Sequence, residues 1–350
     1  MHNSFKIENF SIIFSHFVSN DDLLNSITSE NTQLLHFPIN PNPPWLSFSP
    51  KIELTLTEKS QRHSANHIQN YNTLLAKYPD FVQIYTDGSK SADSAGCSVI
   101  HDDHAIPFSL PHHFSVLSTE LYAIKLAIEY SQNLISNKIL ILSDSLSALH
   151  SIQNFRKKKQ HPISQQVVQI LHSSNKDIIL CWIPSHSKIP QNEKADETAK
   201  LSLNMFPIPN IPIPLSDIKR NCKIFVHRSF QRSWDLVPST NKLKPIKKTI
   251  DSWKTSFQTS RKDEVILFRL RTGHSLLSHG HILNKLPKPL CEICNIPVSI
   301  NHLITECPKF QSERNRLIPN PTLESLLSDS NTQNLRLLTF LKEIDLYNKI

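Results

Sequence analysis

The sequence predicts an α/β fold, a mixed five-stranded sheet flanked by helices, followed by a small helical region that carries a cysteine cluster. Within residues 79–205, three strand-like segments come first at hairpin spacing, and two apolar runs then alternate with helical patterns. Strands joined by short turns pair antiparallel, whereas strands joined by helices lie parallel. This order therefore predicts one sheet of mixed direction with helices on its faces.

Each element is expected from its own pattern. The three leading strands are separated by short polar breaks and occupy residues 81–86, 95–101 and 104–110. A helix follows over residues 115–134, where apolar residues recur at helical spacing and Ser118 is placed to cap the first turn. The remaining elements are two continuous apolar strands at 138–143 and 177–183, and helices at 145–152, 163–172 and 192–205.

Proline-rich segments divide the chain. FPINPNPPWLSFSP leads into the α/β part, and FPIPNIPIPL follows it with four prolines in ten residues. Proline removes a donor and breaks helices, so both segments are expected to be connectors. The predicted organisation is a partly irregular connector with one helix near 65–77 (1–78), the α/β domain (79–205), a basic, partly helical region with helices at 215–234 and 248–270 (206–286), a cysteine–histidine site (287–310) and a tail (311–350).

The excess positive charge lies in the C-terminal part of the chain. The net charge is +8, and residues 206–350 carry 22 basic against 12 acidic residues, a net +10. This distribution predicts a polyanionic partner there, with ordinary solubilising charge as the alternative. No apolar run of 18 residues and no signal-peptide layout is present, so we expect an intracellular protein, nuclear or cytoplasmic, that is neither secreted nor in a membrane.

Four carboxylates stand at the ends of predicted elements. Asp87 and Asp144 close two strands, Glu120 lies in the first turn of the helix between them, and Asp196 lies near the start of the closing helix. Ligand sites in open α/β sheets lie at the carboxyl ends of strands, so all four are expected to converge there. Taken singly, each acid is a turn, cap or surface residue, and the Asp-Gly pair after Thr86 is typical of a turn.

Converging carboxylates repel one another, and nothing basic in these motifs is expected to pair with them. The cluster therefore predicts bound cations. Oxygen ligands favour hard ions, Mg²⁺ first, with Mn²⁺ as the alternative. Two such ions can activate a water and stabilise the leaving oxygen in phosphodiester cleavage.

Four motifs carry a family resemblance. IYTDGSK, STELYAIKLAI, ILSDSLSAL and WIPSHSKIPQNEKADETAK resemble, in order and spacing, a type 1 ribonuclease H over residues 79–205. The resemblance implies cleavage of the RNA strand of RNA–DNA hybrids by two Mg²⁺ ions. It also implies that Gly88 and Ser89 contact the hybrid, and that His186 assists proton transfer and product release. The ligands that it implies for Mg²⁺ are Asp87, Glu120, Asp144 and Asp196.

The chain departs from that family in two places. Ser185, Lys188 and Gln191 occupy positions where relatives carry glycines, which is expected to stiffen the loop of His186. The segment FRKKKQ (155–160) is too short for the basic substrate-gripping helix of some members, so Lys157, Lys158 and Lys159 are either phosphate contacts or solvated. A catalytically weak or inactive nucleic-acid-binding module is therefore the alternative function, with His186 an exposed loop residue.

A second cluster lies near the C-terminus. Three thiols and an imidazole form a closed tetrahedral set, the composition of a structural zinc site. Unbound thiols with a fortuitous spacing are the alternative, and a redox CxxC is disfavoured because no strand–helix context surrounds it. The expected Zn²⁺ ligands are Cys291, Cys294, His302 and Cys307.

The flanking segments carry a further resemblance. LFRLRTGHSLLSHGHILNK followed by the cysteine cluster, with PPWLSFSP upstream of the α/β domain, resembles the C-terminal end of a Jockey-like non-LTR retrotransposon reverse transcriptase polyprotein over about residues 40–310. No tyrosine-x-Asp-Asp polymerase motif is present. The basic region at 206–310 is expected to hold nucleic acid, and a protein partner docked there is the alternative.

Overall fold

The computed structural model describes residues 34–35, 48–57, 67–154, 160–253 and 260–350. The chain forms two compact units, residues 1–225 and 226–350. The helix α9 (Leu215–Asp235) contains the point of division. The five-part organisation expected from the sequence stays a prediction, and the two units are described separately below.

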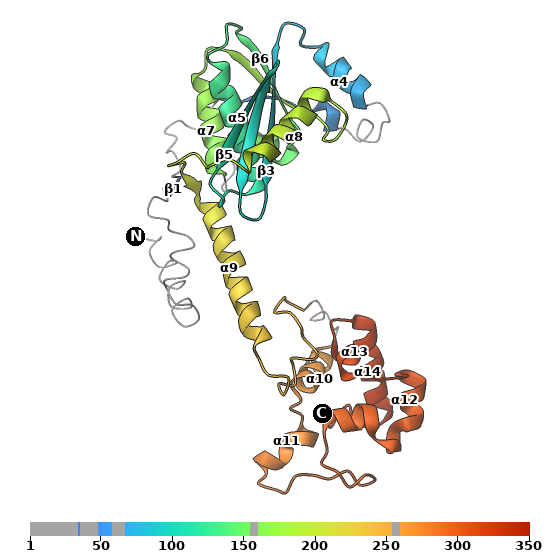
Figure 1. Ribbon diagram of the computed structural model, residues 1–350. Helices are drawn as coiled ribbons and strands as arrows, with labels where there is room; N and C mark the ends of the chain where they lie inside the picture. The colour runs from blue at the N-terminus through green and yellow to red at the C-terminus, as the bar shows by residue number, and fades with distance from the viewer. Residues whose placement is uncertain (1–33, 36–47, 58–66, 155–159, 254–259) are drawn as a thin grey trace. The chain divides into compact units, whose positions relative to one another are not determined.

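Unit 1 is built on a six-stranded mixed sheet with the strand order β2-β7-β6-β3-β4-β5 (Figure 1). The pairs β3–β4 and β4–β5 are antiparallel, whereas β3–β6, β6–β7 and β2–β7 are parallel. The strands are β2 (Lys51–Glu53), β3 (Val82–Lys90), β4 (Ala95–His101), β5 (His104–Leu110), β6 (Lys138–Ser143) and β7 (Asp177–Trp182). A separate parallel pair joins β1 (Leu34–Leu35) to β8 (Ile213–Pro214). The predicted mixed sheet is confirmed.

Helices cover both faces of the sheet (Figure 1). One apolar core lies between the sheet and the helices α5 (Val116–Ser131), α6 (Leu146–Gln153) and α7 (Pro162–Ser173). A second core lies on the opposite face, where α4 (His67–Leu75), α8 (Pro190–Ser202) and the short 3₁₀ helix η2 (Thr55–Thr57) contribute. Strand β6 reads as a continuous apolar run because both of its faces are covered.

Several predicted details of unit 1 differ from the structure. The expected five strands are all present, and β2 adds a sixth from a segment predicted to be irregular. Strand β3 does not end before Asp87 but continues to Lys90, so the Asp-Gly pair forms no turn. Ser115, and not Ser118, caps α5, and its side chain accepts a hydrogen bond from the backbone N–H of Ser118.

Unit 2 is helical. Its core joins α10 (Arg261–Thr272) to the cysteine cluster and to the C-terminal helices. The other elements are α11 (Leu276–Leu283), the π-helix η3 (His302–Glu306), the 3₁₀ helix η4 (Pro308–Phe310), α12 (Gln311–Leu317), α13 (Leu323–Leu327) and α14 (Asn331–Glu343). The helix predicted at 248–270 is wrong in its first part, because residues 248–253 are not helical and α10 begins at Arg261.

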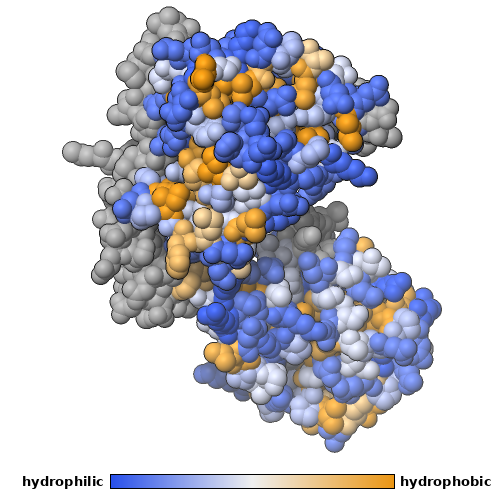
Figure 2. Space-filling model, turned by 45° about the horizontal axis from the view of Figure 1, so that its top comes forward, coloured by the Kyte–Doolittle hydropathy of each residue, from blue (hydrophilic) through white to orange (hydrophobic). Residues whose placement is uncertain are grey.

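On the face drawn in Figure 2, hydrophilic residues predominate and the apolar ones lie in several separate groups. Within the described ranges, no helix combines the length and the apolar character that crossing a bilayer requires. All six cysteines are free thiols.

Candidate functional site

Three carboxylates from three separate elements gather at one edge of the sheet. Asp87 lies within β3, Glu120 in the second turn of α5, and Asp144 directly after β6. Their ligand oxygens lie within 4.8 Å of one another. Asp87 and Glu120 are each only 7% exposed, and Oε2 of Glu120 is buried without a hydrogen-bond partner among the described residues. The predicted convergence of these three acids is thus present.

The sheet register explains why Asp87 and Asp144 meet. Strands β3 and β6 run parallel, and their last paired residues are Thr86 and Ser143. The next residue in each strand direction is an aspartate, so the two carboxylates leave the sheet where the parallel pairing ends. The register between β3 and β4 pairs Asp87 with Ser98 and keeps β3 extended beyond that point.

Gly88 allows α5 to bring Glu120 to this edge. A Cβ at Gly88 would lie 2.6 Å from the backbone nitrogen of Glu120 and 2.9 Å from the carbonyl carbon of Thr119. Contacts this short with backbone atoms cannot be relieved by a side-chain rotation, so any larger residue would push the helix away. The need for glycine is therefore explained by helix packing, and the hybrid contact expected of Gly88 and Ser89 stays a prediction.

Burial and mutual repulsion disfavour charge on all three acids. Burial, together with the charges of Asp144 and Asp196, raises the pKa of Asp87 to about 7. Burial likewise raises the pKa of Glu120 well above its usual range, with the Asp87 and Asp144 charges adding to the effect. The pKa of Asp144 is raised by its burial. Without cations the raised pKa values favour protonation of these acids, and a divalent cation would relieve the same repulsion.

Asp196 stands beside this cluster rather than within it. Its ligand oxygen lies within 4.8 Å of ligand atoms of His186 and Glu193, and its Oδ2 accepts a 2.6 Å hydrogen bond from Nζ of Lys200. The expectation that nothing basic pairs with these acids is therefore wrong. Lys200 follows Asp196 by four residues on α8, a spacing that places both on one helix face. Asp196 remains close enough to raise the pKa of Asp87.

Asn192 and Trp182 hold Asp144 in place, and the sequence reasoning missed both. Nδ2 of Asn192 donates to Oδ2 of Asp144 at 3.3 Å, and Nε1 of Trp182 donates to the Asp144 carbonyl at 3.0 Å. Asn192 is only 3% exposed, and its Oδ1 has no partner among the described residues. The sequence could have indicated Asn192, because it lies one helical turn before Asp196 and on the same face of α8.

His186 lies on an exposed loop with an unfavourable backbone. Its φ is 50° and that of Lys188 is 58°, both in the left-handed region that side chains other than glycine rarely adopt. Lys188 stands where the resemblance expects a glycine, so the structure requires a glycine-like conformation from a residue that resists it. The predicted basic contacts at Lys157, Lys158 and Lys159 lie outside the described residues.

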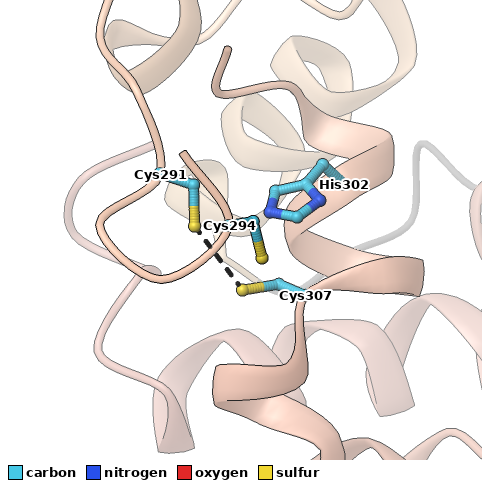
Figure 3. A group of neighbouring side chains, drawn as sticks. All are labelled: Cys291, Cys294, His302 and Cys307. Atoms are coloured by element: carbon cyan, nitrogen blue, oxygen red, sulfur yellow. Dashed lines mark hydrogen bonds between the residues drawn. The ribbon is translucent and has the colours of Figure 1, made fainter. Parts of the chain in front are cut away.

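The cysteine cluster of unit 2 has the dimensions of a tetrahedral metal site. Cys291, Cys294, His302 and Cys307 point toward one another, with ligand atoms within 4.8 Å (Figure 3). The sulfur atoms of Cys291 and Cys307 are 3.8 Å apart. A disulfide needs about 2.05 Å, whereas a tetrahedron with metal–sulfur bonds of about 2.3 Å has edges of about 3.8 Å.

Charge also disfavours three neighbouring thiolates without a cation. Backbone N–H groups of Cys294 and Ile293 and the ring of His302 lower the pKa of the Cys291 thiol to about 6. Burial, together with the neighbouring sulfurs of Cys291 and Cys307, raises the pKa of Cys294 to about 11. A bound divalent cation would remove this repulsion.

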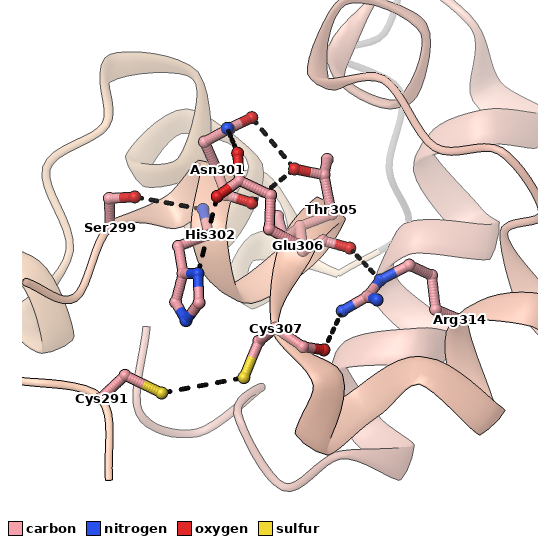
Figure 4. Close-up of polar contacts among 9 residues, drawn as sticks. Cys291, Ser299, Asn301, His302, Thr305, Glu306, Cys307 and Arg314 are labelled. Carbon is pink, nitrogen blue, oxygen red and sulfur yellow. Dashed lines mark hydrogen bonds and ion pairs between the residues drawn. The ribbon is translucent and has the colours of Figure 1, made fainter. Parts of the chain in front are cut away.

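A π-turn brings His302 and Cys307 to the same side. The backbone N–H of Cys307 donates to the carbonyl of His302 at 2.8 Å, an i→i+5 bond. Ser299 Oγ accepts from the backbone N–H of His302, and Glu306 lies 3.6 Å from the Nδ1 atom of His302 (Figure 4). Nε2 of His302 is buried without a hydrogen-bond partner among the described residues, so it is available as a ligand.

Arg314 fixes the end of this turn. Its side chain is 6% exposed, and it donates to the carbonyl of Ile304 at 2.8 Å and to that of Cys307 at 2.6 Å (Figure 4). Two buried carbonyls are thereby satisfied by one guanidinium. No pattern in the sequence indicates this role.

The α/β part of the chain is similar to a known protein family. Residues 79–204 match the family model described as RNase H. This segment contains the three clustered carboxylates, and its mixed sheet with helices on both faces is typical of that family. The match ends before the second unit, so the resemblance of the flanking segments to a retrotransposon polyprotein stays a prediction.

Proposed function

We propose that the RNase H domain at residues 79–204 is a metal-dependent endonuclease that cleaves the RNA strand of RNA–DNA hybrids. The observation that carries this proposal is the group of carboxylates at one sheet edge, formed by the buried Asp87 and Glu120 and the half-buried Asp144. Its oxygen-only ligands suit Mg²⁺ or Mn²⁺. The raised pKa values of the three acids and the orphaned Oε2 of Glu120 support the binding of such ions.

In this proposal the position of each residue in the site determines its role. Asp87, Glu120 and Asp144 hold the ions, with Asp196 as the ligand that joins them once Lys200 moves away. When bound, two ions supply Lewis-acid activation of water and stabilise the leaving oxygen in the phosphodiester displacement. His186, exposed on its loop, moves protons at the rim of the site. A 2′-hydroxyl in the substrate distinguishes RNA from DNA.

A cleavage assay tests the proposal. Full-length protein is incubated with hybrid, duplex DNA and duplex RNA, each labelled on either strand, with Mg²⁺ or Mn²⁺. We expect cleavage of the RNA strand in the hybrid alone, and loss of at least 10³-fold in rate for Asp144→Asn, roughly 4 kcal/mol of transition-state stabilisation. Asp103→Asn removes an exposed carboxylate in the turn between β4 and β5 and should leave the rate unchanged. Equal cleavage by wild type and Asp144→Asn would refute the proposal.

The alternative function is a hybrid-binding module with weak or no turnover. Two observations favour it: Asp196 is engaged by Lys200, and the loop of His186 carries two residues in the left-handed region. Salt-sensitive hybrid binding without cleavage in either metal would support this alternative. Cleavage that responds to Asp144→Asn would exclude it.

We further propose that Cys291, Cys294, His302 and Cys307 bind a structural Zn²⁺. The 3.8 Å sulfur separation and the unpartnered Nε2 of His302 support this. Chelation should unfold residues from about 287 to 310, because metal binding and folding are coupled in such sites. The measurement is circular dichroism and thermal unfolding with and without chelator. An unchanged profile after proven zinc removal would contradict it.

We propose that the protein acts inside the cell on nucleic acid. The basic C-terminal part would hold nucleic acid near the nuclease, in line with the resemblance to a retrotransposon polyprotein. A docked protein partner at residues 206–310 is the competing role. Loss of nucleic-acid affinity when these residues are deleted would support the first role and argue against the second.

A further inference from the structure

Unit 2 contains a cavity of about 450 Å³ that neither proposed site uses. It lies between the end of α10, the helix α11 and the loop that leads to His302, and we refer to it as the basic cavity. Its volume falls within the range of about 300–1,000 Å³ that small-ligand sites occupy. Its apolar lining is formed by Ile246, Leu270, Ile282, Val298, Ile300 and Leu323.

The polar lining of the basic cavity is cationic. Lys242, Arg271 and Lys288 line it together with His279 and His281, and none of its lining residues is acidic. Lys242 and Lys288 are exposed at the rim. The side chain of Arg271 is engaged elsewhere in the unit and contributes a fixed charge.

The groups that act on His279 are all basic. Burial lowers the pKa of His279, and the charges that lower it further all belong to basic groups, namely Lys242, His274, His281 and Lys288. The Nδ1 atom of His281 is buried and has no hydrogen-bond partner in the described part of the chain. Arg271 lies near Asp329, whereas Lys242 and Lys288 stand in a lining that contains no acidic residue.

The position of Lys242 is built into the fold. Its Nζ donates to the carbonyl of Gly273 at 3.3 Å, and its side chain crosses the face of that glycine. A Cβ at Gly273 would lie 2.4 Å from Cδ of Lys242. Gly273 also ends α10 with a φ of 68°. Glycine therefore suits this position for two reasons: it adopts the left-handed backbone readily, and it has no Cβ that would clash with Lys242. The lysine thus lies along a preformed groove at the rim.

The loop that leads to His302 forms one wall of the basic cavity. Val298, Ser299, Ile300 and Asn301 line it, and Ser299 accepts a hydrogen bond from the backbone N–H of His302. Zinc binding at His302 would therefore order this wall. The cavity combines an apolar interior, a cationic rim and a wall held by the metal site.

We propose that the basic cavity binds one unpaired nucleotide of a nucleic-acid strand, with its base against the apolar lining and its phosphates on Lys242 and Lys288. The inference rests on the proposed function for its choice of partner, since the same chain carries the RNase H domain. A base inside a duplex is stacked and paired and cannot enter a cavity, whereas an unpaired base can. The site thus selects single-stranded segments, such as the strand flanking a hybrid.

Binding of short oligonucleotides tests the inference. The affinity of the full-length, zinc-loaded chain is measured by fluorescence anisotropy for a 12-nucleotide oligo(U), a blunt 12-base-pair hybrid and the mononucleotide UMP, over a range of salt concentrations. The test variant is Lys242→Gln with Lys288→Gln. The matched control is Lys342→Gln with Lys349→Gln, which removes the same charge at exposed positions outside the cavity.

We expect the test variant to lose roughly 10- to 30-fold in oligo(U) affinity at 0.1 M salt. On a single strand, each phosphate contact contributes about 0.7 to the slope of log affinity against log salt concentration. The loss of two contacts therefore reduces this slope by about 1.4. Affinity for the blunt hybrid should change no more than in the control variant. Detectable UMP binding to wild type would show that a free nucleotide shares the site, and its absence that a strand is required.

Three outcomes would overturn the inference. One is equal oligo(U) affinity in the test and control variants. The second is an equal loss for oligo(U) and blunt hybrid, which would show only a general charge effect. The third comes from acetylation of lysines read by mass spectrometry, if oligo(U) protects Lys242 and Lys288 no better than Lys342. This measurement needs no folded variant. Hybrid cleavage is assayed in parallel, so a failure of the nuclease proposal is separate from a failure here.

Discussion

Removing one of the clustered carboxylates should stabilise the metal-free protein. Asp87→Asn keeps the size and shape of the side chain but deletes a charge that burial and repulsion disfavour. Because the pKa of Asp87 is raised in the folded state, its carboxyl binds a proton more tightly when folded than when unfolded. Its favourable contribution is therefore fully present below about pH 4 and is lost as pH rises through about 7.

The size of the effect follows from the shift. The pKa of Asp87 moves from 3.8 to about 7, and each pKa unit corresponds to about 1.4 kcal/mol. The ionised carboxylate thus costs the folded state up to about 4 kcal/mol at pH 8. Asp87 is only 7% exposed, so solvent screens little of this. Since Glu120 and Asp144 share the repulsion, we expect Asp87→Asn to stabilise unit 1 by about 2–4 kcal/mol at pH 8, by roughly half of that or less at pH 5 and by nearly nothing at pH 4.

The assay follows unit 1 alone, because the two units can unfold separately. Hydrogen–deuterium exchange of β3 and β6 peptides is measured at several urea concentrations, in EDTA, at pH 5 and pH 8. Adding Mg²⁺ should stabilise wild type by about 2.7 kcal/mol at 100 times its dissociation constant. The variant should gain much less, because it lacks a ligand. Asp103→Asn serves as the control with no expected change.

Two results would refute this reasoning. If Asp87→Asn destabilised unit 1 at pH 8 in EDTA, the three carboxylates would not repel one another in the folded state. If it stabilised equally at pH 5 and pH 8, the gain would arise from packing rather than from charge. Either result would remove the electrostatic basis for a cation at this edge.

Three further predictions follow from single contacts. Gly88→Ala should destabilise unit 1 by roughly 1–3 kcal/mol in urea unfolding and abolish hybrid cleavage, because the added methyl group meets the α5 backbone, whereas Gly280→Ala, with open space around its Cβ, should be neutral or stabilising. Lys188→Gly should stabilise unit 1 by roughly 0.5–1 kcal/mol, the relief of its left-handed backbone less the entropy of glycine, and a loss of stability would contradict this. Arg314→Met should weaken zinc affinity by about 10- to 100-fold in a chelator competition, while Arg316→Met, at an exposed ion pair, should leave it unchanged, and equal affinities would remove the role assigned to the guanidinium.

The sheet of unit 1 could be predicted because its strands are either continuous apolar runs or short segments at hairpin spacing. The gathering of Asp87, Glu120 and Asp144 was also predictable, since adjacent parallel strands present their carboxyl ends at one edge. The extent of β3 was not, because the pairing of Asp87 with Ser98 overrides the turn preference of Asp-Gly. Three residues of β2 could not be predicted either, because their strand exists only through pairing with β7.

Contacts between side chains were harder to predict than the helices and strands of the backbone. The ion pair between Lys200 and Asp196 follows a simple helical spacing and could have been found. The contact of Asn192 with Asp144 depends on how α8 packs on the sheet, and the basic cavity depends on Lys242 crossing a glycine 31 residues later in the chain. Such contacts join segments that have no common pattern in the sequence.

The wide turn between His302 and Cys307 constrains the length of that segment more than its composition. Deleting one residue from Leu303 to Glu306 would leave an ordinary i→i+4 turn, in which the thiol would emerge about 100° away around the axis. The four intervening side chains can therefore vary in kind while their number cannot. A sequence search for other proteins with this site should therefore fix the number of residues between the histidine and the last cysteine and allow any residue types between them.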